Sequence, residues 1–255
     1  MKISINPITY FLLLVILLCG YFNYFLIISI ILFIHDLGHL IILKLLNIKV
    51  DSIEILPFGS LINTNISYNI KSIYLFLIST SGILMQMVLY LIFYLLFSYS
   101  LISDLSYNIF IIYNKLIIIF NLLPIIPLDG SKILFSLLEN IISYKKCLII
   151  MNIISIISII IFIFINTMNL NLLLISFFCL FKTYLEIANH AFIFNKFLLE
   201  RYIYHYKYKK VKNVGSIKNI YKNRLNFINN EREDKILAKI FDIGRYFWYY
   251  LVVCN

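Results

Sequence analysis

Long apolar runs separated by short polar connections occupy the first 184 residues of the chain. A helix needs roughly 20 mostly apolar residues to cross the hydrocarbon core of a bilayer. Several of the runs reach or approach that length, so the pattern predicts membrane-spanning helices. We place six predicted spans, at residues 8–21, 24–44, 73–97, 107–137, 148–165 and 170–184.

Two of the predicted spans have unusual features. The fourth contains Pro124 and Pro127, and because proline removes a backbone donor and clashes with the preceding turn, we expect this span to be bent or discontinuous. The first follows Lys2, as the apolar part of a signal peptide would. No small-residue cleavage pattern comes after it, so we interpret it as a span.

Composition agrees with this pattern, since 62% of the residues are hydrophobic, only 13% are charged, and the mean hydropathy is +0.93. Soluble domains carry about 25% charged residues. We therefore predict an all-α integral membrane protein with about six transmembrane helices. Residues 1–185 form the predicted six-span domain, and residues 186–255 form a polar, basic tail.

Lysine placement predicts the orientation in the membrane, because cytoplasmic connections carry an excess of lysine and arginine. The connection after the second span holds Lys44, Lys49 and Lys71, and the one after the fourth holds Lys145 and Lys146. The alternate connections contain neither residue type. Both termini are thus predicted to be cytoplasmic. We interpret the basic tail as a segment attracted to anionic lipid headgroups of the bilayer, with no nucleic-acid partner.

The second predicted span contains the pattern H-x-x-x-H, formed by His35 and His39, with Asp36 beside the first histidine. Residues at i and i+4 lie on one face of a helix and can bind one metal ion together. Ionisable side chains at membrane depth are expensive and are usually functional. The pattern therefore predicts a metal site inside the bilayer.

A hydrolytic metal site needs a third protein ligand and one position left for water. The best candidate is Asp129, which follows the two prolines of the fourth span and precedes Gly130. In the predicted orientation this segment and the two histidines lie at similar depth, so we place the site between the second and fourth spans. Asp36 is suited to act as a general base toward water activated by the metal.

These motifs in this order resemble the site-2 protease family of intramembrane zinc metalloproteases. The second element is N-x-x-P-x-x-P-L-D-G at residues 121–130, and the resemblance is greatest to the stage IV sporulation intramembrane protease branch. Residues 56–59 match its L-P-F-G loop. Residues 80–86 loosely resemble its A-G-P-x-x-N element, with the proline and the asparagine replaced. The likeness covers residues 33–131 and agrees with a six-span layout.

The resemblance implies one zinc ion bound by His35, His39 and Asp129, and a substrate contact at Asn121. It also implies that the loop containing Pro57, Phe58 and Gly59 lies near an edge strand, to which an unwound substrate helix could add. The implied substrate is a membrane-associated regulatory protein, such as a pro-sigma factor in sporulation. Inhibitory membrane partners and a bacterial cytoplasmic membrane follow by the same analogy.

One position departs from the family pattern, which has glutamate where this chain has Asp36. Aspartate is shorter by one CH2, about 1.5 Å, and a misplacement of ~1 Å can cost ~100-fold in rate. A catalytically inactive membrane scaffold of the same fold is therefore one alternative to the protease. A transporter that uses buried histidine and aspartate is a second. An aspartyl protease using Asp36 and Asp129 is a third, although it leaves the histidines unexplained.

Overall fold

The computed structural model describes residues 2–5, 7, 9–10, 18–56, 59–165, 170–208 and 210–243. It divides into two compact units, which are described separately. The first consists of Met1–Ile66, Tyr74–Leu123 and Leu128–Gly130. The second consists of Ser67–Ile73, Pro124–Pro127 and Ser131–Asn255.

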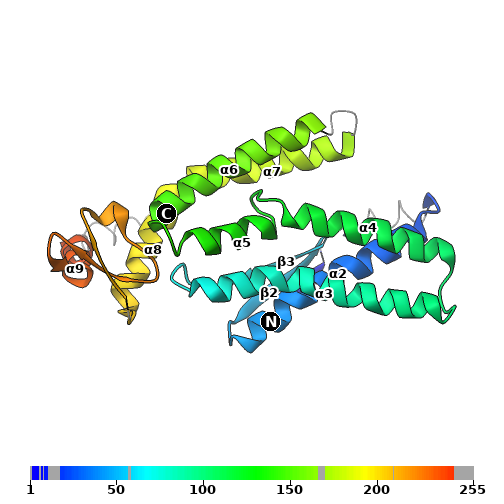
Figure 1. The fold of residues 1–255 in the computed structure, drawn as a ribbon, viewed down its shortest axis with the longest axis horizontal. Helices are drawn as coiled ribbons and strands as arrows, with labels where there is room; N and C mark the ends of the chain where they lie inside the picture. The colour runs from blue at the N-terminus through cyan, green and yellow to red at the C-terminus, as the bar shows by residue number, and fades with distance from the viewer. Residues whose placement is uncertain are drawn as a thin grey trace. The chain divides into compact units, whose positions relative to one another are not determined.

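Three long helices build most of the first unit: α2 (Phe22–Leu45), α3 (Ser72–Ser98) and α4 (Asp104–Leu122) (Figure 1). Their sequences are rich in isoleucine, leucine and phenylalanine on all sides, as is expected of helices surrounded by apolar material. The described core contains Ile31 and Phe110, which are fully buried. The ring of Phe110 stacks on that of Phe93 with centroids 3.8 Å apart, which joins α4 to α3.

A small sheet completes the first unit. Its strands are β1 (Lys2–Ile5), β2 (Val50–Leu56) and β3 (Gly59–Thr64), in the order β1-β2-β3. The strands β1 and β2 are parallel, whereas β2 and β3 form an antiparallel hairpin in which Leu56 pairs with Gly59. Within the described residues β3 pairs on one side only, so it is an edge strand. Pro57 and Phe58, which lie between β2 and β3 in the sequence, are outside the described residues.

The second unit begins its helical part with α5 (Asp129–Leu138), whose first two residues belong to the first unit. It continues with α6 (Tyr144–Ile165), α7 (Leu170–Ala188) and α8 (His190–Tyr204). The chain then forms β4 (Val211–Val214), a 3-10 turn η1 (Ile217–Asn219), β5 (Leu225–Ile228), β6 (Glu231–Arg232) and α9 (Glu233–Ile243). The order in this second sheet is β4-β5-β6.

Among the described residues, four helices are long and apolar enough to cross a membrane: α2, α3, α4 and α6. Residues 172–188 of α7 and the helix α8 form a pair bent by 55°, which would make a fifth span if counted as one. The prediction of a largely helical membrane protein is confirmed. The predicted break at Pro124 and Pro127 is also present, since α4 ends at Leu122 and α5 begins at Asp129. Most of the first predicted span, residues 8–21, lies outside the described residues.

Much of the region predicted as a basic tail is folded where the structure describes it. This region contains the helix α9, and residues 244–255 lie outside the described residues. Leu237 of α9 is fully buried, in a core that also contains Phe197 of α8 and Ile220. The lysine-rich composition of the segment hid these apolar positions.

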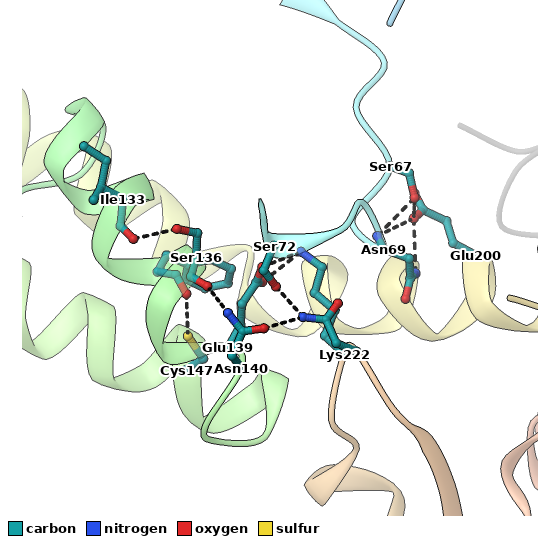
Figure 2. Close-up of polar contacts among 12 residues, drawn as sticks. Ser67, Asn69, Ser72, Ile133, Ser136, Glu139, Asn140, Cys147, Glu200 and Lys222 are labelled. Carbon is teal, nitrogen blue, oxygen red and sulfur yellow. Dashed lines mark hydrogen bonds and ion pairs between the residues drawn. The ribbon is translucent and has the colours of Figure 1, made fainter. Parts of the chain in front are cut away.

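Buried charges hold this part of the second unit together. Arg201 of α8 donates to Glu233 Oε1 at 2.6 Å and to the backbone oxygen of Lys222 at 2.8 Å. Lys222 Nζ donates to both carboxylate oxygens of Glu139, at 2.9 and 2.8 Å. Figure 2 shows the Glu139–Lys222 pair beside Ser72 and Asn140. Buried charges persist where they are paired and hydrogen-bonded, which explains how a polar segment can pack here.

Candidate metal site

The two histidines of the motif are held on one face of α2. His35 is buried, with 5% exposure, and His39 is partly buried one turn later. Their rings meet edge to face with centroids 4.8 Å apart, and the two Nε2 atoms are separated by 3.1 Å. The i, i+4 spacing thus brings two ligand atoms to one point, as the sequence predicted.

Asp129 reaches the same point from the first residue of α5. The two prolines deny a regular helix between α4 and α5, and Gly130 lies so close to the backbone carbonyl of Leu122 that an added Cβ would collide with it. This turn directs the Asp129 carboxylate at the histidines. Its Oδ2 lies 3.0 Å from His35 Nε2 and 3.1 Å from His39 Nε2, and the residue is buried at 5% exposure.

The three donor atoms therefore form a nearly equilateral triangle with sides of 3.0 to 3.1 Å. Ligand atoms about 2.0–2.1 Å from a tetrahedral zinc ion are separated by roughly 3.3 Å, as the geometry of that coordination requires. Two imidazoles and one carboxylate are also a ligand set that catalytic zinc accepts. The residues present fit one zinc ion.

The opposite nitrogen of each ring has its own partner. His39 Nδ1 lies 2.7 Å from the backbone oxygen of Ile78, which can only accept, so the hydrogen is on Nδ1. His35 Nδ1 lies 3.0 Å from Gln86 Oε1. Both contacts place the hydrogen on Nδ1 and leave the lone pair of Nε2 directed at the triangle. Metal-binding histidines usually have such a partner for the second nitrogen.

Two glycines allow α2 and α3 to approach closely enough for these contacts. A Cβ added to Gly82 would lie 2.5 Å from Cε1 of His35, and one added to Gly38 would lie 2.5 Å from the backbone oxygen of Ser81. Small residues permit such close crossings of membrane helices. The sequence analysis did not assign roles to Gln86, Ile78 or Gly82. The loose resemblance of residues 80–86 to a family element was the one signal that pointed to this segment.

The other predicted site residues differ in how far the structure describes them. Asp36 is partly buried and forms a cluster with His35 and His39 in which the potential ligand atoms lie within 4.8 Å of one another. Asn121 is partly buried at the end of α4, and no described hydrogen bond joins it to the triangle. Gly59 is the first residue of β3.

Known proteins resemble the chain in sequence and in fold. Residues 101–165 match the sequence profile of Peptidase family M50. Stage IV sporulation protein FB of Bacillus subtilis (strain 168) is 30% identical to the chain over 146 residues, which are 57% of this chain and 51% of that protein. The chain thus spans about half the length of the curated relative that it matches.

The fold of the chain is similar to that of a solved structure. The Site-2 Protease from Methanocaldococcus jannaschii superposes with a TM-score of 0.54 over 73% of this chain and 91% of that chain, at 23% identity. The chain is an integral membrane protein that is similar to Peptidase family M50 over residues 101–165 and to a site-2 protease in its fold. The predicted likeness to the stage IV sporulation branch is confirmed.

Proposed function

We propose that the chain is an intramembrane zinc metalloendopeptidase that binds one zinc ion through His35, His39 and Asp129. The observation that supports this most directly is the triangle of donor atoms, Nε2, Nε2 and Oδ2, with sides of 3.0 to 3.1 Å. The match of residues 101–165 to the sequence profile of Peptidase family M50 supports the same function. The site would lie between the second and fourth predicted spans.

Asp36 and Asn121 would have separate roles in the reaction. Bound zinc lowers the pKa of water toward ~7 and supplies a nucleophile at ordinary pH. Asp36, in the same cluster as the two histidines, would accept the proton of the attacking water and transfer it to the leaving amine. Asn121 would hold the substrate backbone near the site.

Strand β3 offers a way to present an extended substrate. A peptide bond in a transmembrane helix is shielded by the hydrogen bonds of that helix, so the substrate must be opened locally. An edge strand can accept an extended peptide as an additional strand, and β3 pairs only with β2 among the described residues. Pro57, Phe58 and Gly59 would contact the substrate, as the sequence resemblance implies.

The substrate would be a membrane-associated regulatory protein, and processing of a pro-sigma factor in sporulation is the specific case implied by the sequence resemblance. The curated relative is named as a sporulation protein. Membrane proteins that inhibit cleavage would be further partners. We assign residues 1–185 to the protease domain and residues 186–255 to a basic cytoplasmic tail. Both termini would face the cytoplasm of a bacterial cell.

Zinc content of the detergent-purified protein is the first test, with a His35→Ala/His39→Ala double variant as the comparison. We expect about one zinc per chain in the parent and a loss of that zinc in the variant. Metal-free protein in both samples, after zinc has been offered, would contradict the proposal.

An inactive scaffold remains the second candidate because of the short side chain of Asp36. A parent that binds zinc but does not cleave a reconstituted membrane substrate would favour it. Appearance of cleavage in an Asp36→Glu variant would then show that the missing CH2 is the cause.

A further inference from the structure

Gln86 is a fully buried amide in the middle of a largely apolar helix. Its side chain has 0% exposure. It lies on α3, which is long and apolar enough to cross a membrane. A buried amide without hydrogen bonds is strongly disfavoured in such surroundings. Its retention in the core therefore calls for partners.

The partners of Gln86 come from both neighbouring helices of the first unit. Its Oε1 lies 3.0 Å from Nδ1 of His35 on α2. Its Nε2 donates to Oδ1 of Asn114 on α4 at 3.4 Å. Asn114, which is also buried, donates from Nδ2 to the backbone oxygen of Gln86 at 3.4 Å. A chain of polar groups thus runs from α4 through α3 to the imidazole on α2.

The direction of this chain decides how His35 is presented. Because the amide nitrogen of Gln86 donates to Asn114, its oxygen faces His35, and an oxygen can only accept. His35 must then carry its hydrogen on Nδ1, which leaves the lone pair of Nε2 directed at Asp129 and His39. Rotating the amide by half a turn would instead aim its NH2 group at Nδ1, which would then accept and leave the hydrogen of the neutral ring on Nε2.

We propose that Gln86 is a positioning residue that, oriented by Asn114, fixes the tautomer and the ring orientation of His35 for metal binding. This inference rests on the metal site proposed above. A neutral amide performs the task without adding charge, which matters at membrane depth. The site would already hold two carboxylates, Asp36 and Asp129, and their charges balance that of one divalent cation.

A measurement of metal affinity distinguishes the positioning of His35 by Gln86 from a role of Gln86 in packing alone. Gln86→Met has similar length but lacks an acceptor, and loss of such a supporting hydrogen bond typically lowers metal affinity about 10–100-fold. We expect that loss in Gln86→Met. We expect Gln86→Glu, which keeps an acceptor facing His35, to recover the affinity, and Asn114→Leu to give an intermediate loss because Gln86 then loses its orienting partner.

A matched control exists on the same helix. Ser79 is fully buried, but its hydroxyl donates to the backbone oxygen of Leu75 one turn earlier. Ser79→Ala should therefore leave metal affinity unchanged. The affinity of each full-length variant is measured in detergent by competition between the protein and a zinc chelator. The absorption spectrum of the cobalt(II)-substituted protein reports ligand geometry separately from stability.

The outcomes distinguish this inference from the proposed function. A parent that binds no metal would overturn both. A parent that binds zinc, with affinity and cobalt spectrum unchanged in Gln86→Met and Asn114→Leu, would overturn only the role of Gln86. Equal loss in Gln86→Met and Gln86→Glu would also overturn it, because the acceptor would then be irrelevant. If Gln86→Met does not fold, Asn114→Leu with Ser79→Ala carries the same comparison.

Discussion

Asp36 has the side chain whose length bears most directly on catalysis in the proposed site. Its carboxylate lies in the cluster with His35 and His39, but it is one CH2 shorter than the family's glutamate, and a shortfall of ~1 Å in a reacting group can cost ~100-fold in rate. We expect Asp36→Glu to raise the cleavage rate about 10–100-fold without changing zinc content. Cleavage of a reconstituted membrane substrate measures this.

The control for this prediction is Asp36→Ala, which should abolish cleavage while retaining zinc. A lower rate in Asp36→Glu than in the parent would contradict the expectation and would mean that the surrounding backbone is fitted to the shorter side chain.

Gly82 is the second residue with a sharp consequence. An added Cβ would lie 2.5 Å from Cε1 of His35, so Gly82→Ala must displace the imidazole or separate α2 from α3. Overpacking of a well-packed core typically costs about 1–3 kcal/mol. We expect a lower melting temperature and reduced zinc content. Gly215→Ala, which would meet no atom within 4 Å, should change neither; a Gly82→Ala variant that also changes neither would refute the expectation.

The three residues proposed as metal ligands could be selected from the sequence, whereas the residues that contact them could not. His35 and His39 have a spacing that only one helix face explains, and Asp129 is a carboxylate in an apolar segment broken by prolines. Gln86 and Asn114 have no such spacing. They matter because α2, α3 and α4 come together in the folded protein, where Gly38 and Gly82 permit the close approach of α2 to α3.

At the scale of elements, the boundary between α4 and α5 was the most predictable feature, because two prolines act locally on the backbone. The strands β4, β5 and β6 were not predicted. Each is short, and in β5 the buried positions, which alternate with partly buried ones, are Asn226 and Ile228, so no apolar alternation marks the strand. Asn226 is satisfied by Glu233 at 2.8 Å, a contact that appears only after folding.

Arg201 links three elements of the second unit, since it contacts Glu233 at the start of α9 and the backbone of Lys222 and Arg224 before β5. Removing one partner of a buried ion pair costs about 3–5 kcal/mol, because the other charge stays unpaired. We therefore expect Arg201→Met to reduce the hydrogen-exchange protection of β5 and α9. Protection should remain at parental levels in Arg232→Met, whose pair with Asp234 is exposed; equal effects of the two variants would count against this assignment.

At the scale of the whole second unit, the Glu139–Lys222 pair predicts a dependence on pH. Burial raises the pKa of Glu139, although Lys222 and a hydrogen bond from Ser72 oppose the shift. Burial likewise lowers the pKa of Lys222. Lys222→Met removes the opposing cation, so the pKa of Glu139 in the folded state rises further. Between the unfolded and the raised pKa the folded state binds more protons, and stability falls as pH rises.

The variant Lys222→Met should thus be destabilised more at about pH 8 than at about pH 5, where Glu139 is more readily neutral. Melting temperatures of the variant and the parent at both pH values measure the difference. A Glu139→Leu/Lys222→Met double variant should be close to the parent and nearly independent of pH, since an apolar pair often replaces a buried ion pair without loss. A pH-independent effect of Lys222→Met would contradict this reasoning.

The polar cluster of Figure 2 also constrains how the chain is inserted into the membrane. It joins Ser72, just before the apolar part of α3, to Asn223, which is 151 positions later, and joins Glu139 to Lys222. These residues can meet only if the connections before α3 and after α5 and the segment after α8 all emerge on one side of the bilayer. A chain with one helix inserted in the wrong direction could not close the cluster. Contacts made by residues that are synthesised late would therefore stabilise the chain only when the earlier helices have been inserted in the correct orientation.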